Sequence, residues 1–190
     1  MKNISNRIQK FFNQFFLFLS FLAILLIGGL FQSCEEEIEG CSDSSACNYN
    51  SEATIDDGTC CFPLEEIIEI THADYEVSGP VGEDVTADIH IKNASCDQVG
   101  IMVRKMTTDP AAYFCFAGSC YTSNITVSEN PLIVQSCQEV DGDIDGDGFY
   151  DYFKGYFNST EEGEYQVTYR FYLQDDLNTA VEVTITYIIS

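Results

Sequence analysis

Alternation between apolar and polar residues is the main pattern of the chain after residue 65. Apolar side chains occupy every second position at 85–91, 99–103, 165–173 and 181–189. Shorter apolar segments lie at 66–77, 111–116, 120–127, 131–136 and 149–157. A period of two is typical of a strand with one buried and one exposed face, and no segment here has a clear helical period. The pattern therefore predicts about seven to nine short strands.

Residues that favour turns separate these segments. They are Gly79-Pro80, Asn93, Asp109-Pro110, Asn130-Pro131, Glu162-Gly163 and Asp175-Asp176. Glycine, proline, asparagine and aspartate each supply a backbone conformation or a local hydrogen bond that a turn needs. Short strands at this spacing favour an all-β domain at 65–190, an antiparallel β-sandwich of immunoglobulin-like type. A β-barrel is the alternative architecture.

Residues 1–33 have the layout of a secretory signal peptide. Residues 1–10 carry three positive charges, and no charged residue lies between 11 and 33. A basic head followed by an apolar run is typical of such signals. The run ends in Leu30-Phe31-Gln32-Ser33-Cys34, which resembles the lipobox of bacterial lipoproteins. The resemblance implies cleavage after Ser33 and a lipid on Cys34, whereas about 20 apolar residues could also remain as an uncleaved membrane anchor.

An acidic segment follows the lipidation site. Residues 34–40 contain Glu35-Glu36-Glu37-Ile38-Glu39 and form the expected tether between the lipid and the folded chain. An acidic cluster directly after the lipidated cysteine resembles the export signal of Bacteroidetes-type lipoproteins. That resemblance implies an outer-membrane lipoprotein displayed on the cell surface, held to the membrane through its lipid. A plain solvated tether is the alternative interpretation of the charge run.

Eight further cysteines follow Cys34 and indicate an oxidising compartment. They are Cys41, Cys47, Cys60, Cys61, Cys96, Cys115, Cys120 and Cys137. The first four lie in residues 41–64, which have too few apolar residues for a core and need covalent cross-links to hold one shape. We expect two disulfides among these four cysteines, with all three pairings open.

The segment around these four cysteines resembles a short repeat of Bacteroidetes surface proteins. The matching residues are Gly40-Cys41, Ala46-Cys47-Asn48-Tyr49-Asn50, Ala53-Thr54, Asp56-Asp57-Gly58 and Cys60. The resemblance implies a small cysteine-rich module at 41–64 in front of the β-sandwich.

The remaining four cysteines lie in the predicted β-sandwich. Cys115 and Cys120 are close enough in sequence to close a tight loop, and we then expect Cys96 to pair with Cys137. The segment from Tyr113 to Tyr121, with Phe153 to Phe157 and the strands after Gly163, resembles β-sandwich modules of Bacteroidetes secreted proteins over roughly residues 80–190.

The segment 141–151 is the strongest candidate for a ligand site. Asp143, Asp145 and Asp147 alternate with other residues and precede Gly148, as in an Asp-x-Asp-x-Asp-Gly calcium loop. Phe149 would add its carbonyl, Asp151 the ninth-position oxygen and Asp141 a further carboxylate. Lys154 stands where an EF-hand has glutamate, so the resemblance is to calcium loops of the thrombospondin type-3 or dockerin kind. We expect weak, structural calcium binding, with an acidic surface loop as the alternative.

Net charge then limits the function classes. The chain has 8 Lys and Arg against 31 Asp and Glu, a formal charge of −23, which excludes nucleic-acid binding through phosphates. At 45% hydrophobic and 13% aromatic, the chain is too apolar for a disordered acidic tail. We therefore predict a non-enzymatic adhesion or interaction module that binds an extracellular protein or glycan. A glycan-binding accessory lipoprotein of an outer-membrane uptake system is the alternative, and a carboxylate-based hydrolase is a weaker one.

Overall fold

The computed structural model describes residues 36–142 and 151–190, and it separates a unit of residues 1–37 from a unit of residues 38–190. The predicted signal peptide and its lipidation site at Cys34 lie outside the described residues. No helix within the described ranges is long and apolar enough to cross a membrane.

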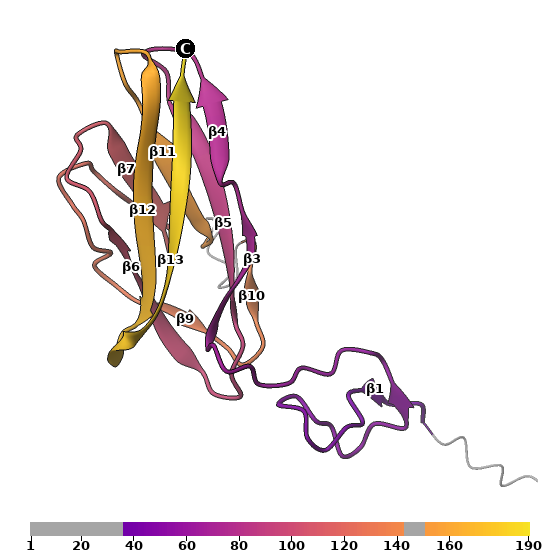
Figure 1. Ribbon diagram of the computed structural model, residues 1–190. Helices are drawn as coiled ribbons and strands as arrows, with labels where there is room; N and C mark the ends of the chain where they lie inside the picture. Colours follow the sequence, from indigo (N-terminus) through magenta and orange to yellow (C-terminus); the bar gives the residue numbers. More distant parts are fainter. Residues whose placement is uncertain (1–35, 143–150) are drawn as a thin grey trace, which may run out of the picture. The chain divides into compact units, whose positions relative to one another are not determined.

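Two β-sheets form the larger part of the second unit (Figure 1). The first has the order β10 (Glu139–Val140), β5 (Val85–Asn93), β11 (Phe153–Phe157), β7 (Ala112–Phe116) and β8 (Ser119–Tyr121), and β3 (Ile68–Ala73) also pairs with β5. The second has the order β4 (Glu76–Gly79), β13 (Asp176–Ile189), β12 (Gly163–Leu173), β6 (Val99–Lys105) and β9 (Leu132–Val134). All these pairs are antiparallel except β4 with β13.

The topology confirms the predicted immunoglobulin-like β-sandwich and not the barrel. Strands β3, β5, β11 and β7 have the neighbour order A-B-E-D of an immunoglobulin domain, and β6, β12 and β13 have the order C-F-G. The segment 66–77, which the pattern treats as one strand, instead forms β3 and β4 in different sheets. Asp74 and Tyr75 separate the two strands, and a shift of register between Ile70 and His72 interrupts the period of two within β3. The apolar content of the segment reveals neither break.

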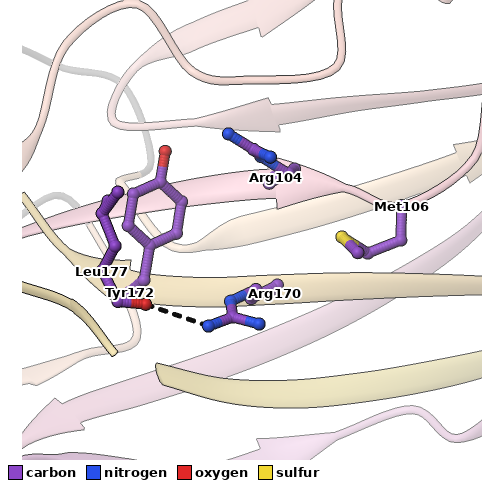
Figure 2. A pocket seen from close by; sticks show the side chains of 5 residues that line it. All are labelled: Arg104, Met106, Arg170, Tyr172 and Leu177. Atoms are coloured by element: carbon purple, nitrogen blue, oxygen red, sulfur yellow. Dashed lines mark hydrogen bonds between the residues drawn. The ribbon is translucent and has the colours of Figure 1, made fainter. Parts of the chain in front are cut away.

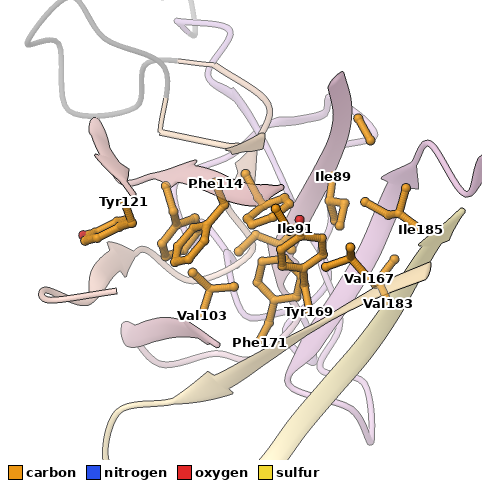
Figure 3. Close-up of a cluster of buried hydrophobic side chains, with 14 of the residues drawn as sticks. Ile89, Ile91, Val103, Phe114, Tyr121, Val167, Tyr169, Phe171, Val183 and Ile185 are labelled. Carbon is orange, nitrogen blue, oxygen red and sulfur yellow. The ribbon is translucent and has the colours of Figure 1, made fainter. Parts of the chain in front are cut away.

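Apolar residues from both sheets meet in one core (Figure 3). On β5, the buried hydrophobic residues are Val85, Ala87, Ile89 and Ile91, the same set that the alternation assigns to one face. Aromatic rings fill the centre of the sandwich. Phe153 on β11 lies 4.5 Å from the ring of Tyr169 and 5.3 Å from that of Phe171, both on β12. Such tilted and edge-on pairs add to the stability gained by burial of apolar area.

Gly155 on β11 lies directly against a pair of buried tyrosines from the other sheet. A Cβ atom at this position would lie 2.6 Å from the Tyr187 hydroxyl and 3.1 Å from the Tyr169 hydroxyl. Both tyrosines are fully buried, and their hydroxyls interact with each other without a well-formed hydrogen bond and have no other partner among the described residues. Burial raises the pKa of each phenol well above its ordinary value. Glycine is therefore required here to leave room for the two hydroxyls.

The cysteine-rich module at 41–64 has almost no core of its own. Its strands β1 (Glu39–Gly40) and β2 (Ile55–Asp56) have two residues each, and Cys41 and Ala46 are its buried hydrophobic residues. Local side-chain hydrogen bonds shape its turns: the Asp43 carboxylate accepts from the Ser45 backbone at 2.9 Å. That bond lowers the pKa of Asp43, because the ionised carboxylate is the better acceptor.

The disulfide pairs differ in part from those expected from the sequence. The structure pairs Cys41 with Cys60 and Cys115 with Cys120, the second as expected. The expected Cys96–Cys137 bond is wrong, and so is the expectation of two disulfides inside the module. Cys47 instead bonds Cys96, and Cys61 bonds Cys137, so two disulfides join the module to the sandwich.

These two cross-links lie next to each other. The Sγ atoms of Cys47, Cys61 and Cys137 are within 4.8 Å of one another. Each sulfur is already bonded in a disulfide, so none is available as a thiolate ligand for a metal. The short module therefore gains its stability from the larger domain, because it cannot bury enough apolar area alone.

Candidate functional site

The acidic segment 141–151 joins β10 to β11, and its two ends are held together. The Asp151 backbone N–H donates to the Gly142 carbonyl at 2.9 Å, and the Asp151 carbonyl accepts from Ala117 at 3.1 Å. Asp141 is exposed, whereas Asp151 is only 2% exposed and belongs to the base of the loop. The other predicted calcium ligands lie outside the described residues: Asp143, Asp145, Asp147 and Phe149. The structure thus shows a closed loop base but does not test the ligand set.

The outward face of the sheet that contains β5 carries a row of aromatic and charged side chains. The rings of His72 and His90 are 5.0 Å apart, and His90 meets the ring of Tyr152 edge-on at 5.1 Å. His72 also lies 3.3 Å from the carboxylate of Asp74. Both histidines therefore belong to a row of side chains on this outward face and contact one another.

The same face continues across β11 and β7. The Nζ of Lys154 lies 3.3 Å from Asp88 and 5.4 Å from the centre of the Tyr152 ring. Burial alone would lower the pKa of Lys154, but Tyr152 and Asp88 outweigh that effect and raise it. Tyr113 and Tyr156 stack in parallel at 4.6 Å. We call the surface formed by His72, His90, Tyr152, Lys154, Tyr156 and Tyr113 the aromatic face.

The stacked tyrosines have one property that affects recognition. Partial burial raises the pKa of Tyr156, and burial with a hydrogen bond to Asp84 raises that of Tyr113. Both phenols stay neutral at physiological pH. Because the two rings lie parallel at 4.6 Å, each covers one face of the other. A sugar ring could stack only on the outer sides of the pair.

The other sheet carries a different kind of site on its outward face. Its pocket of about 170 Å³ is lined by Arg104, Met106, Arg170, Tyr172 and Leu177 (Figure 2). We call it the arginine pocket. The two arginines are direct neighbours across β6 and β12. Inward-facing Val103 and Phe171 flank them in sequence and anchor these strands in the core, which fixes the arginines on the outside.

Hydrogen bonds hold the side chain of Arg170 in place, whereas the guanidinium group of Arg104 is available to a ligand. Arg170 donates from Nη1 to Glu182 at 3.2 Å and from Nη2 to the Leu177 carbonyl at 2.9 Å, the bond drawn in Figure 2. Arg104 is exposed and has no ion pair or side-chain hydrogen bond within the described residues. Met106 and Leu177 are 51% and 61% exposed and form apolar sides of the pocket.

The amino-acid sequence alone does not indicate the arginine pocket. Arg104 and Arg170 are 66 residues apart and belong to no recognisable motif. Two signals could have indicated it: they are the only arginines after Cys34, and each occupies an outward position beside an inward apolar residue. Only the register of β6 against β12 brings them together.

A hollow of about 290 Å³ lies between residues 65–68 and 178–181. Its charged lining residues are Glu65 and Glu66, and both are exposed. It offers no positive charge and no large aromatic ring. The arginine pocket is therefore the hollow with the more specific chemistry.

Comparisons with known proteins give only weak likenesses. No protein-family model matches this chain, and no curated protein matches it. Among solved structures, the N-terminal domain of PorA has a TM-score of 0.41 and 13% identity, over 65% of this chain and 96% of that domain.

Two more solved structures show the same degree of likeness. The CARDB domain of the PF1109 protein from Pyrococcus furiosus, in complex with di-metal ions, has a TM-score of 0.37 and 18% identity, over 72% of this chain and 100% of the other. A conjugative transposon lipoprotein from Bacteroides eggerthii has a TM-score of 0.34 and 10% identity, over 63% and 93%. All three TM-scores are low, and we base no argument on them.

Proposed function

We propose that this chain is a surface-displayed lipoprotein whose β-sandwich acts as a non-catalytic adhesion or interaction module, stabilised by calcium. One observation carries the proposal: all eight cysteines of the described part are bonded in disulfides. Disulfides persist in oxidising compartments outside the cytosol. The leader and Cys34 would then supply export and a lipid anchor, and the acidic tether would hold the folded domain away from an anionic membrane.

The mass of the protein purified from its own membrane tests export and anchoring together. We expect a chain that begins at Cys34, carries acyl groups, and gains about 8 Da on reduction, because four disulfides each take up two hydrogen atoms. A Cys34→Ser variant serves as the matched control and should keep its leader and lack lipid. A cytosolic chain with an uncut leader and free thiols would refute the proposal.

Protease treatment of intact cells tests surface display separately. A displayed domain should be cleaved when protease is added outside, whereas a domain facing the periplasm should be protected until the outer membrane is opened. Replacing the four glutamates at 35–37 and 39 with glutamine should reduce display if the acidic segment is the export signal. Unchanged display would assign that segment to the tether alone.

Calcium is the proposed cofactor of the loop at 141–151. The closed base formed by Gly142 and Asp151 supports this, since it would keep the carboxylates between them in one loop. Carboxylates that repel one another gain from a divalent cation. With a dissociation constant on the order of 10⁻⁴ to 10⁻³ M, about 5 mM calcium would add roughly 1–2 kcal/mol to the free energy of unfolding.

Thermal unfolding with and without calcium tests this part. The melting temperature should rise in about 5 mM calcium and stay constant in magnesium. Asp145→Ala and Asp147→Ala should each abolish the rise. Asp176→Ala, at the exposed first residue of β13, is the matched control and should keep it. A calcium response that persists in both loop variants would refute the assigned ligands.

The aromatic face supports a protein partner more than a glycan. Tyr113 and Tyr156 cover each other, and Tyr152 already contacts His90 and Lys154, so most ring faces are occupied. Aromatic residues such as tyrosine are enriched at protein interfaces relative to the rest of the surface. A glycan array is the discriminating test, because specific binding there would favour the accessory role in glycan uptake.

A further inference from the structure

We propose that the arginine pocket binds a carboxylate side chain of a partner protein, presented on a short peptide segment next to an aliphatic side chain. This inference deepens the proposed function as an interaction module and rests on it. It names the chemistry of the partner and a second binding surface, on the sheet opposite the aromatic face.

The placement of positive charge is the first argument. The described chain has three lysines besides the two arginines, and each lysine already has a partner: Lys92 pairs with Glu69, Lys154 with Asp88, and buried Lys105 donates to the backbone carbonyls of Ala112 and Ser123. Both arginines gather at one pocket instead. In a chain of net charge −23, this pocket is a local exception.

The register of the sheet is the second argument. Arg104 and Arg170 lie directly opposite each other on neighbouring strands, and like charges in such positions destabilise a sheet. Glu182 offsets the charge of Arg170 alone. With 31 acidic residues in the chain, none of the described ones pairs with Arg104. An incoming carboxylate would relieve the repulsion that the fold leaves in place.

The geometry of the guanidinium groups is the third argument. Arg170 is fixed by two hydrogen bonds, so little conformational entropy is lost when a ligand contacts it. Arg104 keeps its whole planar fork of donors available, and that fork matches the two oxygens of a carboxylate. The two side chains would thus act as one preorganised and one adaptable contact.

The size and lining of the pocket select the class of ligand. A volume of about 170 Å³ is smaller than the roughly 300–1,000 Å³ typical of sites for small molecules, so it fits one side chain and not a whole metabolite. Exposed Met106 and Leu177 offer apolar surface beside the charges, and methionine adapts to varied partners. Arginine and tyrosine in a central pocket are also typical of binding hot spots.

Long-range repulsion allows a single carboxylate but opposes a polyanion. The Debye length is about 8 Å at physiological ionic strength, so an acidic side chain in the pocket is attracted by nearby arginines and screened from distant carboxylates. A phosphate chain or nucleic acid would extend over the acidic surface and be repelled. The expected partner segment therefore carries one acidic residue among apolar or neutral ones.

Nitrogen-15 NMR of the mature protein, purified from its own membrane in detergent, tests the inference. The mature chain has two arginine Nε–H groups, so their signals report on the pocket alone. The probes are two blocked pentapeptides, Ser-Leu-Glu-Leu-Ser and Ser-Leu-Gln-Leu-Ser. We expect the glutamate peptide to shift both arginine signals in a saturable way, and the glutamine peptide to leave them unchanged.

Matched variants make the result specific. Arg104→Gln should weaken binding of the glutamate peptide by about tenfold or more, because it removes a charge-assisted pair of hydrogen bonds. Arg104→Lys keeps the charge but loses the fork, and should recover only part of the affinity. Lys92→Gln removes the same charge from the other sheet and should leave the affinity unchanged. High salt should weaken binding in the unaltered protein.

Several outcomes would overturn the inference. They are equal binding of both peptides, shifts that survive Arg104→Gln, and a response to galacturonate or inorganic phosphate in place of the peptide. These results would leave the proposed function intact if the mass and protease experiments succeed. Conversely, a cytosolic chain with free thiols would refute the proposed function, and the titration would still report on the pocket.

Discussion

Replacing Tyr187 with phenylalanine should stabilise this protein, although the side chain is fully buried at the centre of the sandwich. Its hydroxyl interacts with the Tyr169 hydroxyl without a well-formed hydrogen bond, has no other partner among the described residues, and lies 2.6 Å from the Cβ position of Gly155. A buried polar group without a partner costs about 1–3 kcal/mol. Removing it while keeping the ring should raise the free energy of unfolding by about 1 kcal/mol, or the melting temperature by roughly 2–4 °C.

Gly155→Ala should have the opposite effect, because its Cβ would overlap the Tyr187 hydroxyl. Such overpacking costs about 1–3 kcal/mol. In the Tyr187→Phe background the overlapping atom is absent, and the nearest remaining one is the Tyr169 hydroxyl at 3.1 Å. The cost of Gly155→Ala should then fall below about 1 kcal/mol, so the two changes should be strongly coupled.

Urea denaturation followed by far-UV circular dichroism, with all disulfides intact, measures the four members of this cycle. Tyr75→Phe is the control, since Tyr75 is 62% exposed and its hydroxyl should contribute little. A decrease in the free energy of unfolding on Tyr187→Phe would refute this, because it would show a hydroxyl whose hydrogen bond contributes about 0.5–1.5 kcal/mol. Strictly additive effects of the two changes would also refute it.

Three further predictions concern pH, the buried polar network and the cross-links. Burial holds the pKa of Tyr169 above that of an unfolded tyrosine, so the free energy of unfolding should fall as the pH rises above about 10. In an alkaline titration, Tyr169→Phe should reduce this fall in the free energy of unfolding, whereas Tyr75→Phe should not. Asn93 is fully buried, and its side-chain amide donates to three backbone carbonyls. An aspartate carboxylate cannot donate, so Asn93→Asp should lower the free energy of unfolding, measured by urea denaturation, by about 3 kcal/mol. A decrease below about 1 kcal/mol would contradict this. Replacing both Cys47 and Cys96 by serine should lower the free energy of unfolding by up to about 4 kcal/mol, the closure entropy of a loop with a sequence separation of 49. The double variant should also be cleaved more readily by protease within residues 41–60. Equal protease resistance of the two proteins would refute the role of this disulfide in holding the module.

Most strands could be predicted because burial on one face imposes a period of two that sequence alone displays. The alternation at 85–91 and 99–103 predicts β5 and β6 and the residues that they bury. Division of the segment 66–77 into two strands could not be predicted, because apolar residues continue through the whole segment while β3 and β4 join different sheets. Sheet membership depends on long-range pairing, which a local pattern does not contain.

Disulfide pairing shows the same limit. Cys115 and Cys120 lie on the two strands of a short hairpin, so proximity in sequence is enough to predict their bond. Cys47 and Cys61 bond cysteines of the sandwich that are 49 and 76 residues away. Treating the module and the sandwich as separate units led to the wrong pairing, since each contains an even number of cysteines.

Of the two candidate ligand sites, sequence could predict only the contiguous one. The calcium ligands fall within eleven residues and follow a known spacing, and they stay a prediction here. The arginine pocket depends on Arg104 lying opposite Arg170 across β6 and β12, with Leu177 added from the start of β13. No local sequence spacing indicates that these two arginines are neighbours, because their proximity depends on the register of β6 against β12.

The two disulfides between the cysteine-rich module and the sandwich also determine how tension enters this protein. A pull on the chain ahead of Cys41 passes through Cys47 to Cys96, between β5 and β6, and through Cys61 to Cys137, between β9 and β10. It bypasses residues 62–67, so it does not enter the sandwich at the start of β3. The load is instead divided between two loops, one joining β5 to β6 at Cys96 and one joining the edge strands β9 and β10 at Cys137.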